Sequence, residues 1–101
     1  MSNELIEASR NTAMQASLKA TLDCAKAFAT TDFRPDLAAF TVPTLIIHGT
    51  EDKTVPIDAS ARAAVKGIAH AKLIEYEGAP HGLFATHKEQ LTADLLKFLH
   101  Q

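Results

Sequence analysis

The chain has 101 residues, of which 47% are hydrophobic and 22% are charged, and its formal net charge is −2. This composition excludes a disordered segment and predicts a single globular domain, residues 1–101. The basic residues are dispersed along the chain and form no positive stripe. We therefore expect no nucleic-acid partner and no anionic membrane surface.

Cysteine content and hydropathy bear on where the protein works. Cys24 is the only cysteine, so an internal disulfide is excluded. No N-terminal apolar run resembles a signal peptide or a bilayer-spanning helix, so we expect a cytoplasmic location. We expect Cys24 to be buried as a small hydrophobe near Leu22 and Phe28, because nothing local would lower the pKa of its thiol and make it a nucleophile.

Residues 3–29 contain neither proline nor glycine and are rich in helix formers, which predicts one broken helix or two helices. The clearest helical periodicity lies at Leu18, Leu22, Ala25 and Phe28. The first half is weakly patterned, so its face needs another surface to cover it. A new local turn is expected at Arg34, because Pro35 breaks what precedes it and suits the first turn of a helix.

A buried strand is predicted at residues 44–49, a short, apolar and β-branched run between a proline and a glycine. Such a run is typical of a strand covered on both faces. An amphipathic helix follows, with Asp58 as a plausible N-cap and apolar positions at Ala61, Ala64, Val65 and Ile68.

A second strand is predicted at residues 72–76, followed by a loop at 77–82. The last helix opens with a predicted capping box of Thr86 and Glu89 and is expected to bury Leu91, Leu95, Phe98 and Leu99. Strand, helix, strand and helix in this order predict an α/β fold with two parallel strands and a right-handed crossover.

Asp52 and His81 are the residues that could carry chemistry. Asp52 follows the first strand and His81 lies in the loop after the second, and catalytic groups of parallel sheets gather at that edge. If the strands are adjacent, the two side chains meet. An acid that accepts the Nδ1–H of a histidine leaves its Nε2 free to take a proton from a nucleophile.

Each of these residues also has a simpler interpretation. Taken alone, an aspartate near a glycine is usually a turn former, and a histidine in a proline-glycine loop is usually structural. His48 could join Asp52 and His81 as a metal ligand, but a zinc site needs a third protein ligand in firm geometry, and we expect no metal. The other histidines are expected at the surface: His70, His87 and His100.

Two motifs, in register, resemble those of a known family, the cofactor-free haloperoxidases and aryl esterases (perhydrolases) of the α/β-hydrolase fold. The first is Leu-Ile-Ile-His-Gly at residues 45–49 leading to Asp52 and then Val-Pro at 55–56, and the second is Ala-Pro-His-Gly at 79–82. The resemblance runs over nearly the whole chain and implies that the chain corresponds to the C-terminal part of such an enzyme. It gives Asp52 the place of the catalytic acid, His81 that of the base, and residues 1–30 that of a helical, cap-like segment before a βαβα part at 31–101.

The sequence departs from this family in lacking a recognisable nucleophile. A nucleophile elbow needs glycine around the serine, and no serine stands in such a frame: Ser2, Ser9, Ser17 and Ser60. The resemblance thus implies a truncated or split esterase or perhydrolase that needs no cofactor. Such an enzyme would act on a small acyl ester only if another polypeptide supplied the serine and the oxyanion donors.

A rival interpretation is a non-catalytic assembly module. The first strand is expected to leave one apolar edge open at residues 45–48, without charges or prolines to protect it. We expect that edge to pair with a second copy of the chain or with an upstream hydrolase fragment.

Overall fold

The computed structural model describes all 101 residues, and contacts divide them into two compact units, Met1–Phe33 and Arg34–Gln101. The division lies close to the expected boundary at residues 30 and 31. That the whole chain is one domain stays a prediction. None of the helices combines the length and the apolar character that a membrane crossing requires.

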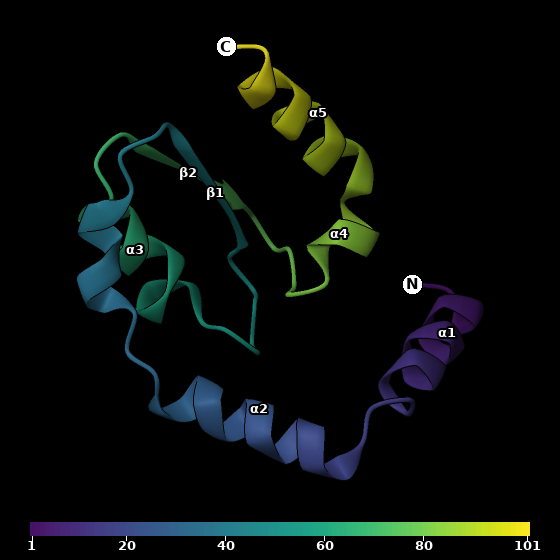
Figure 1. Ribbon diagram of the computed structural model, residues 1–101. Coiled ribbons are helices and arrows are strands. Elements are labelled where there is room, and N and C mark those ends of the chain that lie inside the picture. Colours follow the sequence, from purple (N-terminus) through teal and green to yellow (C-terminus); the bar gives the residue numbers. More distant parts are fainter. The chain divides into compact units, whose positions relative to one another are not determined.

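The first unit consists of two helices, α1 (Asn3–Ala13) and α2 (Leu18–Thr30), drawn in purple and blue in Figure 1. Each begins after a serine whose hydroxyl accepts a backbone N–H, Ser2 from Leu5 at 3.1 Å and Ser17 from Ala20 at 3.0 Å. These caps satisfy backbone donors that a helix otherwise leaves unpaired, which separates the two helices. The helical prediction is confirmed in its two-helix form.

No residue of α1 or α2 is buried. Cys24 is exposed, so the expectation that it lies in an apolar environment is wrong. The regular spacing of Leu18, Leu22 and Phe28 does mark one helical face, but a unit of two short helices is too small to enclose it. Periodicity predicted the helix and did not predict a cover for it.

The second unit is an α/β arrangement of two strands with five helical segments before, between and after them. In chain order it contains the 3-10 helix η1 (Arg34–Ala39), β1 (Thr44–Gly49), the 3-10 helix η2 (Ile57–Ala59), α3 (Ala61–Gly67), β2 (Ala71–Tyr76), α4 (Leu83–Thr86) and α5 (Lys88–Leu99). The predicted βαβ unit with a trailing helix is therefore present. Asp58 is not the N-cap of α3, because that helix begins three residues later, after Ser60.

The strands β1 and β2 form a two-stranded parallel sheet, with Thr44 opposite Ala71 and Gly49 opposite Tyr76. Parallel pairing follows from the crossover through α3, as predicted. Every residue of β1 except Gly49 is only half-buried, so the expectation of a strand buried on both faces is wrong for this chain. A sheet of two strands leaves one side of β1 without a neighbouring strand.

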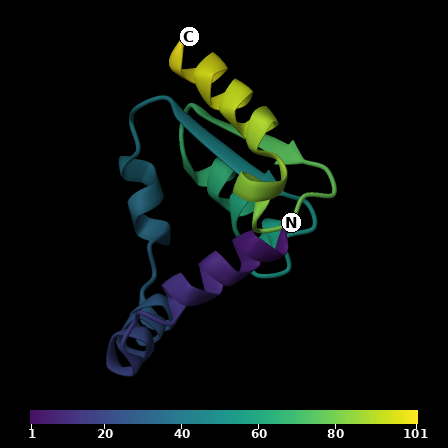
Figure 2. The same ribbon diagram turned by 90° about the vertical axis from the view of Figure 1, so that its right-hand side faces the viewer.

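Side chains of β2 alternate between the two faces of this sheet, with Glu75 bound by Arg62 of α3 and Tyr76 bound by Asp94 of α5. Figures 1 and 2 show α3 and α5 on opposite sides of the strands. The core of the unit is small and comprises Ile57, Ala61, Ile68, Tyr76 and Ala79.

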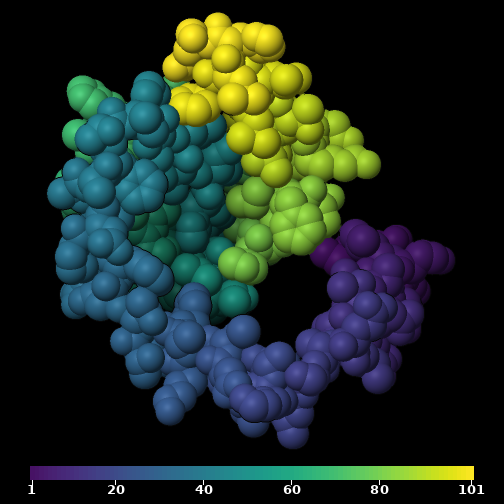
Figure 3. Space-filling view, viewed as in Figure 1, coloured from purple at the N-terminus to yellow at the C-terminus, as the bar shows by residue number.

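The last helix differs from its prediction at both ends. α5 begins at Lys88 after His87, with no side-chain cap, and Thr86 belongs to α4, so the predicted capping box is wrong. No residue of α5 is buried, and Leu99 is 72% exposed. The space-filling view shows α5, in yellow, at the surface of the molecule (Figure 3). Its apolar residues follow helical spacing but meet too little sheet to be covered.

Candidate active site

The candidate site lies where both parallel strands end. Asp52 follows the last residue of β1 by three positions, and His81 follows the last residue of β2 by five. Because Gly49 and Tyr76 are opposite each other in the ladder, the two loops leave the sheet at the same edge. The topology therefore brings together residues that are 29 positions apart in the sequence.

Backbone hydrogen bonds hold the two loops against each other. Thr50 N–H donates to Tyr76 O at 3.0 Å, and Glu51 N–H donates to Ala79 O at 3.0 Å. The Thr50 hydroxyl accepts from the N–H of Gly78 at 2.7 Å. Since the groups that bind are mainly backbone atoms, the spacing of the loops depends little on side-chain rotamers.

Gly49 allows this close approach. A Cβ atom at that position would lie 2.1 Å from Ala79 O, a distance that real Cβ atoms do not reach. Any other residue would push the loop of His81 away from the end of β1. The glycine of the His-Gly motif is thus required for spacing at the site.

Asp52 and His81 are in direct contact, as expected from the sequence. His81 Nδ1 lies 2.7 Å from Asp52 Oδ2, the distance of a strong charge-assisted hydrogen bond. Because a carboxylate can only accept a hydrogen bond, Nδ1 of His81 must carry the proton in this contact. The Asp52 side chain is 4% exposed and that of His81 is 56% exposed, and no hydrogen bond occupies His81 Nε2. A nearly enclosed acid thus orients an accessible imidazole.

The environment of Asp52 favours its charged form. Burial by itself would raise its pKa, but hydrogen bonds from the Val55 N–H and from His81, together with the attraction of His81 and a bond from Thr54 N–H, outweigh it and hold the pKa below the ordinary value. Asp52 Oδ1 accepts from Thr54 N–H at 3.0 Å and from Val55 N–H at 2.8 Å. The Asp52 carboxylate is therefore held by its own loop as well as by His81.

His48 also reaches Asp52. Its Nε2 lies 3.3 Å from Asp52 Oδ2 and 2.8 Å from Val55 O. His48, Asp52 and His81 are the three residues weighed as metal ligands, but no group of three or more His, Cys, Asp or Glu side chains is arranged to hold a metal ion. Among the other histidines, His87 is half-buried with its ring 6.0 Å from that of Tyr76, so its surface assignment was wrong.

All four serine hydroxyls have local partners. Ser2 and Ser17 cap helices, Ser9 donates to Leu5 O at 2.9 Å, and Ser60 donates to Pro56 O at 2.7 Å. Each bond spans three or four residues, the pattern of helix caps and of hydroxyls bound to the preceding turn. None of these serines stands in a nucleophile elbow.

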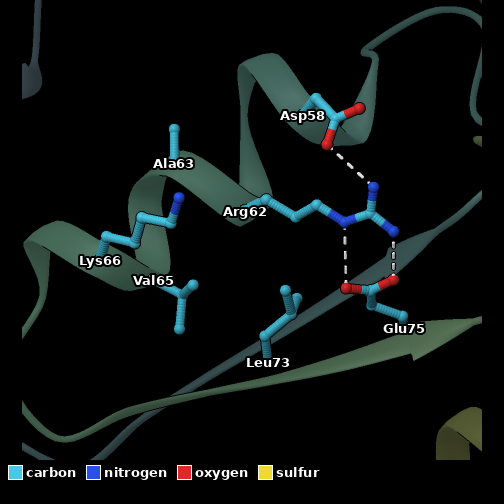
Figure 4. A pocket seen from close by; sticks show the side chains of 7 residues that line it. All are labelled: Asp58, Arg62, Ala63, Val65, Lys66, Leu73 and Glu75. Carbon is cyan, nitrogen blue, oxygen red and sulfur yellow. Dashed lines mark hydrogen bonds and ion pairs between the residues drawn. The ribbon is translucent and has the colours of Figure 1, made fainter.

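A separate hollow of about 490 Å³ lies between α3 and β2 (Figure 4). Arg62 lines it and donates three hydrogen bonds to carboxylates. Its Nη2 lies 2.6 Å from Glu75 Oε1, its Nε 3.1 Å from Glu75 Oε2 and its Nη1 2.8 Å from Asp58 Oδ1. These bonds raise the pKa of Arg62 and lower that of Glu75. The hollow contains neither Asp52 nor His81, and its arginine is paired with two carboxylates, so it is not the candidate site.

Several residues that build the site were not predicted from the sequence. Thr50 joins the two loops, and Thr54 and Val55 bind the carboxylate through backbone N–H groups. Backbone donors leave no mark on residue type, so only the Asx-turn tendency of Asp52 could have indicated them. The position of Gly49 directly before an acidic loop was the available signal for the close approach.

A parallel β-α-β unit with an acid after one strand, a histidine after the next, and a hydrogen bond between them defines the chain as an α/β hydrolase. The model of the serine aminopeptidase S33 family matches residues 3–88, and the chain belongs to this family.

Relatives carry haloperoxidase and esterase names. A non-heme haloperoxidase of Rhodococcus erythropolis is 44% identical over 85% of this chain and 31% of its own length. A bifunctional esterase/perhydrolase of Acinetobacter calcoaceticus is 40% identical over 85% of this chain and 31% of its own length. Among solved structures, the crystal structure of a bromoperoxidase from Bacillus anthracis matches this chain with a TM-score of 0.96 and 44% sequence identity. The match covers 100% of this chain and 37% of the bromoperoxidase chain. The chain thus spans about a third of the length of the relatives it matches.

Proposed function

We propose that Asp52 and His81 are the acid and base of a serine-hydrolase triad of the esterase and perhydrolase type, with the serine supplied by a polypeptide segment outside these 101 residues. The observation that carries the proposal is the 2.7 Å bond from His81 Nδ1 to the enclosed Asp52 carboxylate, with Nε2 unoccupied. This arrangement fixes the tautomer that a general base requires. The names of the relatives support an acyl ester as the substrate class.

The proposed chemistry consists of two acyl transfers. His81 Nε2 takes the serine proton while Oγ attacks the ester carbonyl, and the collapsing intermediate expels an alkoxide or phenolate that receives this proton. Water then attacks the acyl serine and releases a carboxylic acid, whereas hydrogen peroxide in its place releases a peracid. Asp52 stabilises the imidazolium that forms in each half, and no cofactor enters either step.

Complementation tests the proposal. The chain is mixed or co-expressed with the part of the Rhodococcus erythropolis relative that it does not match, and hydrolysis of a short aryl ester is followed. The mixture is expected to gain turnover, and Asp52→Asn is expected to lower kcat by about 10⁴-fold, since the carboxylate sets the tautomer. The isolated chain should show only weak histidine-dependent background, because oxyanion stabilisation is missing.

The matched control is the same mixture with His81→Ala. Turnover that survives this change would overturn the role of His81. A complex that forms, as judged by sedimentation, yet stays inactive with every aryl ester tried would overturn the catalytic proposal as a whole. Turnover by the isolated chain that depends on Cys24 would show a different nucleophile.

As a second candidate function, we propose self-assembly through the open side of β1. This strand pairs only with β2, and the residues of β1 carry no acidic, lysine, arginine or proline side chain that would discourage pairing. Two-stranded sheets are marginal alone, so antiparallel pairing of β1 with its copy would give a four-stranded sheet about a two-fold axis.

Sedimentation velocity at micromolar concentration tests this assembly. We expect a dimer, and we expect the added hydrolase fragment of the complementation experiment to dissociate it, because one strand edge cannot pair twice. A stable monomer would overturn the assembly proposal. A dimer that persists unchanged beside a bound fragment would place its interface elsewhere.

A further inference from the structure

A second imidazole contacts the carboxylate of Asp52. His48 lies within β1, one residue before its end, and its side chain is only 13% exposed. Its Nε2 is 2.8 Å from Val55 O and 3.3 Å from Asp52 Oδ2. Since Val55 O can only accept, Nε2 of His48 carries the ring proton and donates it there, and the same N–H group lies close to the carboxylate without a hydrogen bond to it.

Three hydrogen bonds and the contact with His48 surround the carboxylate of Asp52. Oδ1 receives the N–H groups of Thr54 and Val55, and Oδ2 faces His81 and His48. Val55 takes part twice, because its N–H binds Asp52 while its carbonyl binds His48. The acid loop is thereby closed onto the strand. A rotation of the carboxylate about χ2 would break bonds on both oxygens.

We propose that His48 is a positioning residue that holds Asp52 Oδ2 toward His81 Nδ1. The inference rests on the proposed function of the Asp52–His81 pair and deepens it. His48 touches neither substrate nor nucleophile in this role. It acts through the carboxylate, because its N–H group, placed by the strand, lies 3.3 Å from Oδ2 and holds the acid loop through Val55 O.

A purely structural role is the alternative, in which His48 only braces Val55. The two roles differ in what happens at His81. If His48 orients the carboxylate, its loss weakens the preference of His81 for the Nδ1–H tautomer. If it only braces the loop, its loss lowers thermal stability and leaves that tautomer unchanged.

The test is ¹⁵N NMR of the ring nitrogens in the full chain labelled at histidine, at about pH 9, where ordinary imidazoles are neutral. Protonated and unprotonated ring nitrogens differ strongly in chemical shift, so the tautomer of each ring is read directly. Signals are assigned with single glutamine substitutions at the three histidines outside the site, His70, His87 and His100.

Three variants of His48 are compared with the natural chain. His48→Phe keeps the ring volume and removes the donor, His48→Asn keeps a donor that is too short, and His48→Gln places an amide near the original Nε2. The ratio of Nδ1–H to Nε2–H tautomer at His81 is expected to fall on the order of threefold in the first two variants, as for loss of one weak polar contact to the carboxylate. Glutamine should restore it, and Asp52→Asn should give the largest fall.

The outcomes separate this inference from the proposal on which it rests. If His81 of the natural chain lacks the Nδ1–H tautomer, the Asp52–His81 pair itself fails. If the natural chain has it and folded His48→Phe or His48→Asn keeps the same ratio, only the role of His48 is overturned. If both variants lose the dispersed spectrum of a folded chain, His48 is a folding residue and the inference is likewise overturned.

Discussion

Asp52 is nearly enclosed, yet its carboxyl group loses its proton more readily than that of a free aspartate. Desolvation opposes this change, but hydrogen bonds from Val55 and His81 and the charge of His81 outweigh it. The same bonds fix the direction of the carboxylate. Stability and orientation at this residue therefore have one physical origin, the hydrogen bonds to the charged form.

The lowered pKa of Asp52 predicts a stability that depends on acid. Its folded pKa lies below the unfolded value of 3.8, so the stabilisation is present above about pH 4 and is lost as pH falls through the folded pKa. Asp52→Asn should lower the free energy of unfolding at neutral pH and flatten the acid limb. Urea titrations across a pH series measure both. Glu75→Gln is the control. The pKa of Glu75 is also lowered, in its case by Arg62, and Glu75 lies outside the site. An acid limb unchanged by Asp52→Asn would contradict the assignment.

Gly49→Ala is expected to destabilise the chain and to separate the two loops. The added methyl would meet the carbonyl of Ala79 at 2.1 Å, and backbone cannot move aside as a side chain does. Overpacking typically costs about 1–3 kcal/mol, and we expect a loss near the upper end of that range. Chemical denaturation measures the loss, and the NMR signal of the His81 Nδ1 proton reports the contact.

Gly67→Ala is the matched control for this substitution. Its added methyl would lie 2.8 Å from Leu37 Cδ1, the flexible end of a side chain. We expect a change within about 1 kcal/mol, since alanine also favours the helix. Equal losses at Gly49 and Gly67 would show that loop spacing is not what Gly49 provides.

At the scale of elements, α5 is attached to the sheet by a polar contact. Tyr76 is the largest fully buried side chain, and its hydroxyl donates to Asp94 Oδ2 at 2.5 Å. Burial, followed by the bond to Asp94, raises the pKa of Tyr76 to about 12. Because β2 directs Tyr76 and Glu75 to opposite faces, one strand is joined to α5 on one side and to α3 on the other.

Tyr76→Phe is expected to loosen α5 while leaving the ring in place. Loss of a buried hydrogen bond to a charged group should lower the free energy of unfolding by about 1–2 kcal/mol. The natural contribution is present below about pH 10 and disappears as pH rises through about 12, so the variant should lack that alkaline loss. Denaturation at several pH values and amide exchange in α5 measure these effects. Exchange that speeds up in α3 as much as in α5 would contradict a local attachment.

At the scale of the whole molecule, burial is confined to one of the two units. Every buried residue lies within Arg34–Gln101, and Met1–Phe33 contains none. Helices without a buried face have little beyond their own hydrogen bonds and caps to stabilise them. The two units therefore differ in the free energy required to open their backbone hydrogen bonds.

Hydrogen exchange of the full chain should reveal this difference. Amides of α1 and α2 are expected to exchange with low protection. Those in β1, β2 and α3 should be better protected, because they exchange only through sub-global opening. Exchange followed by NMR or by mass spectrometry of peptides measures it. Protection in α2 equal to that in β2 would show that something covers the exposed apolar face of α2.

Local signals were sufficient for most elements. The run of β-branched residues at 44–49 predicted β1 at its observed bounds, and the order of elements predicted parallel pairing. Capping failed at Asp58 and Thr86, because a 3-10 turn and a short helix precede α3 and α5. Side-chain identity indicates that a helix start is near, whereas the path of the entering chain decides which residue occupies it.

The sequence by itself determined the α/β order, the two strands and the loops that carry Asp52 and His81, because these depend on periodicity and turn residues within a few positions. Only the tertiary structure decided that Gly49 admits Ala79, that backbone N–H groups of Thr54 and Val55 fix the carboxylate, and that His48 faces it. It also decided which apolar positions are covered, leaving Leu99 exposed. Such contacts join atoms that are distant in sequence or belong to the backbone, so residue type gives at most an indirect signal of them.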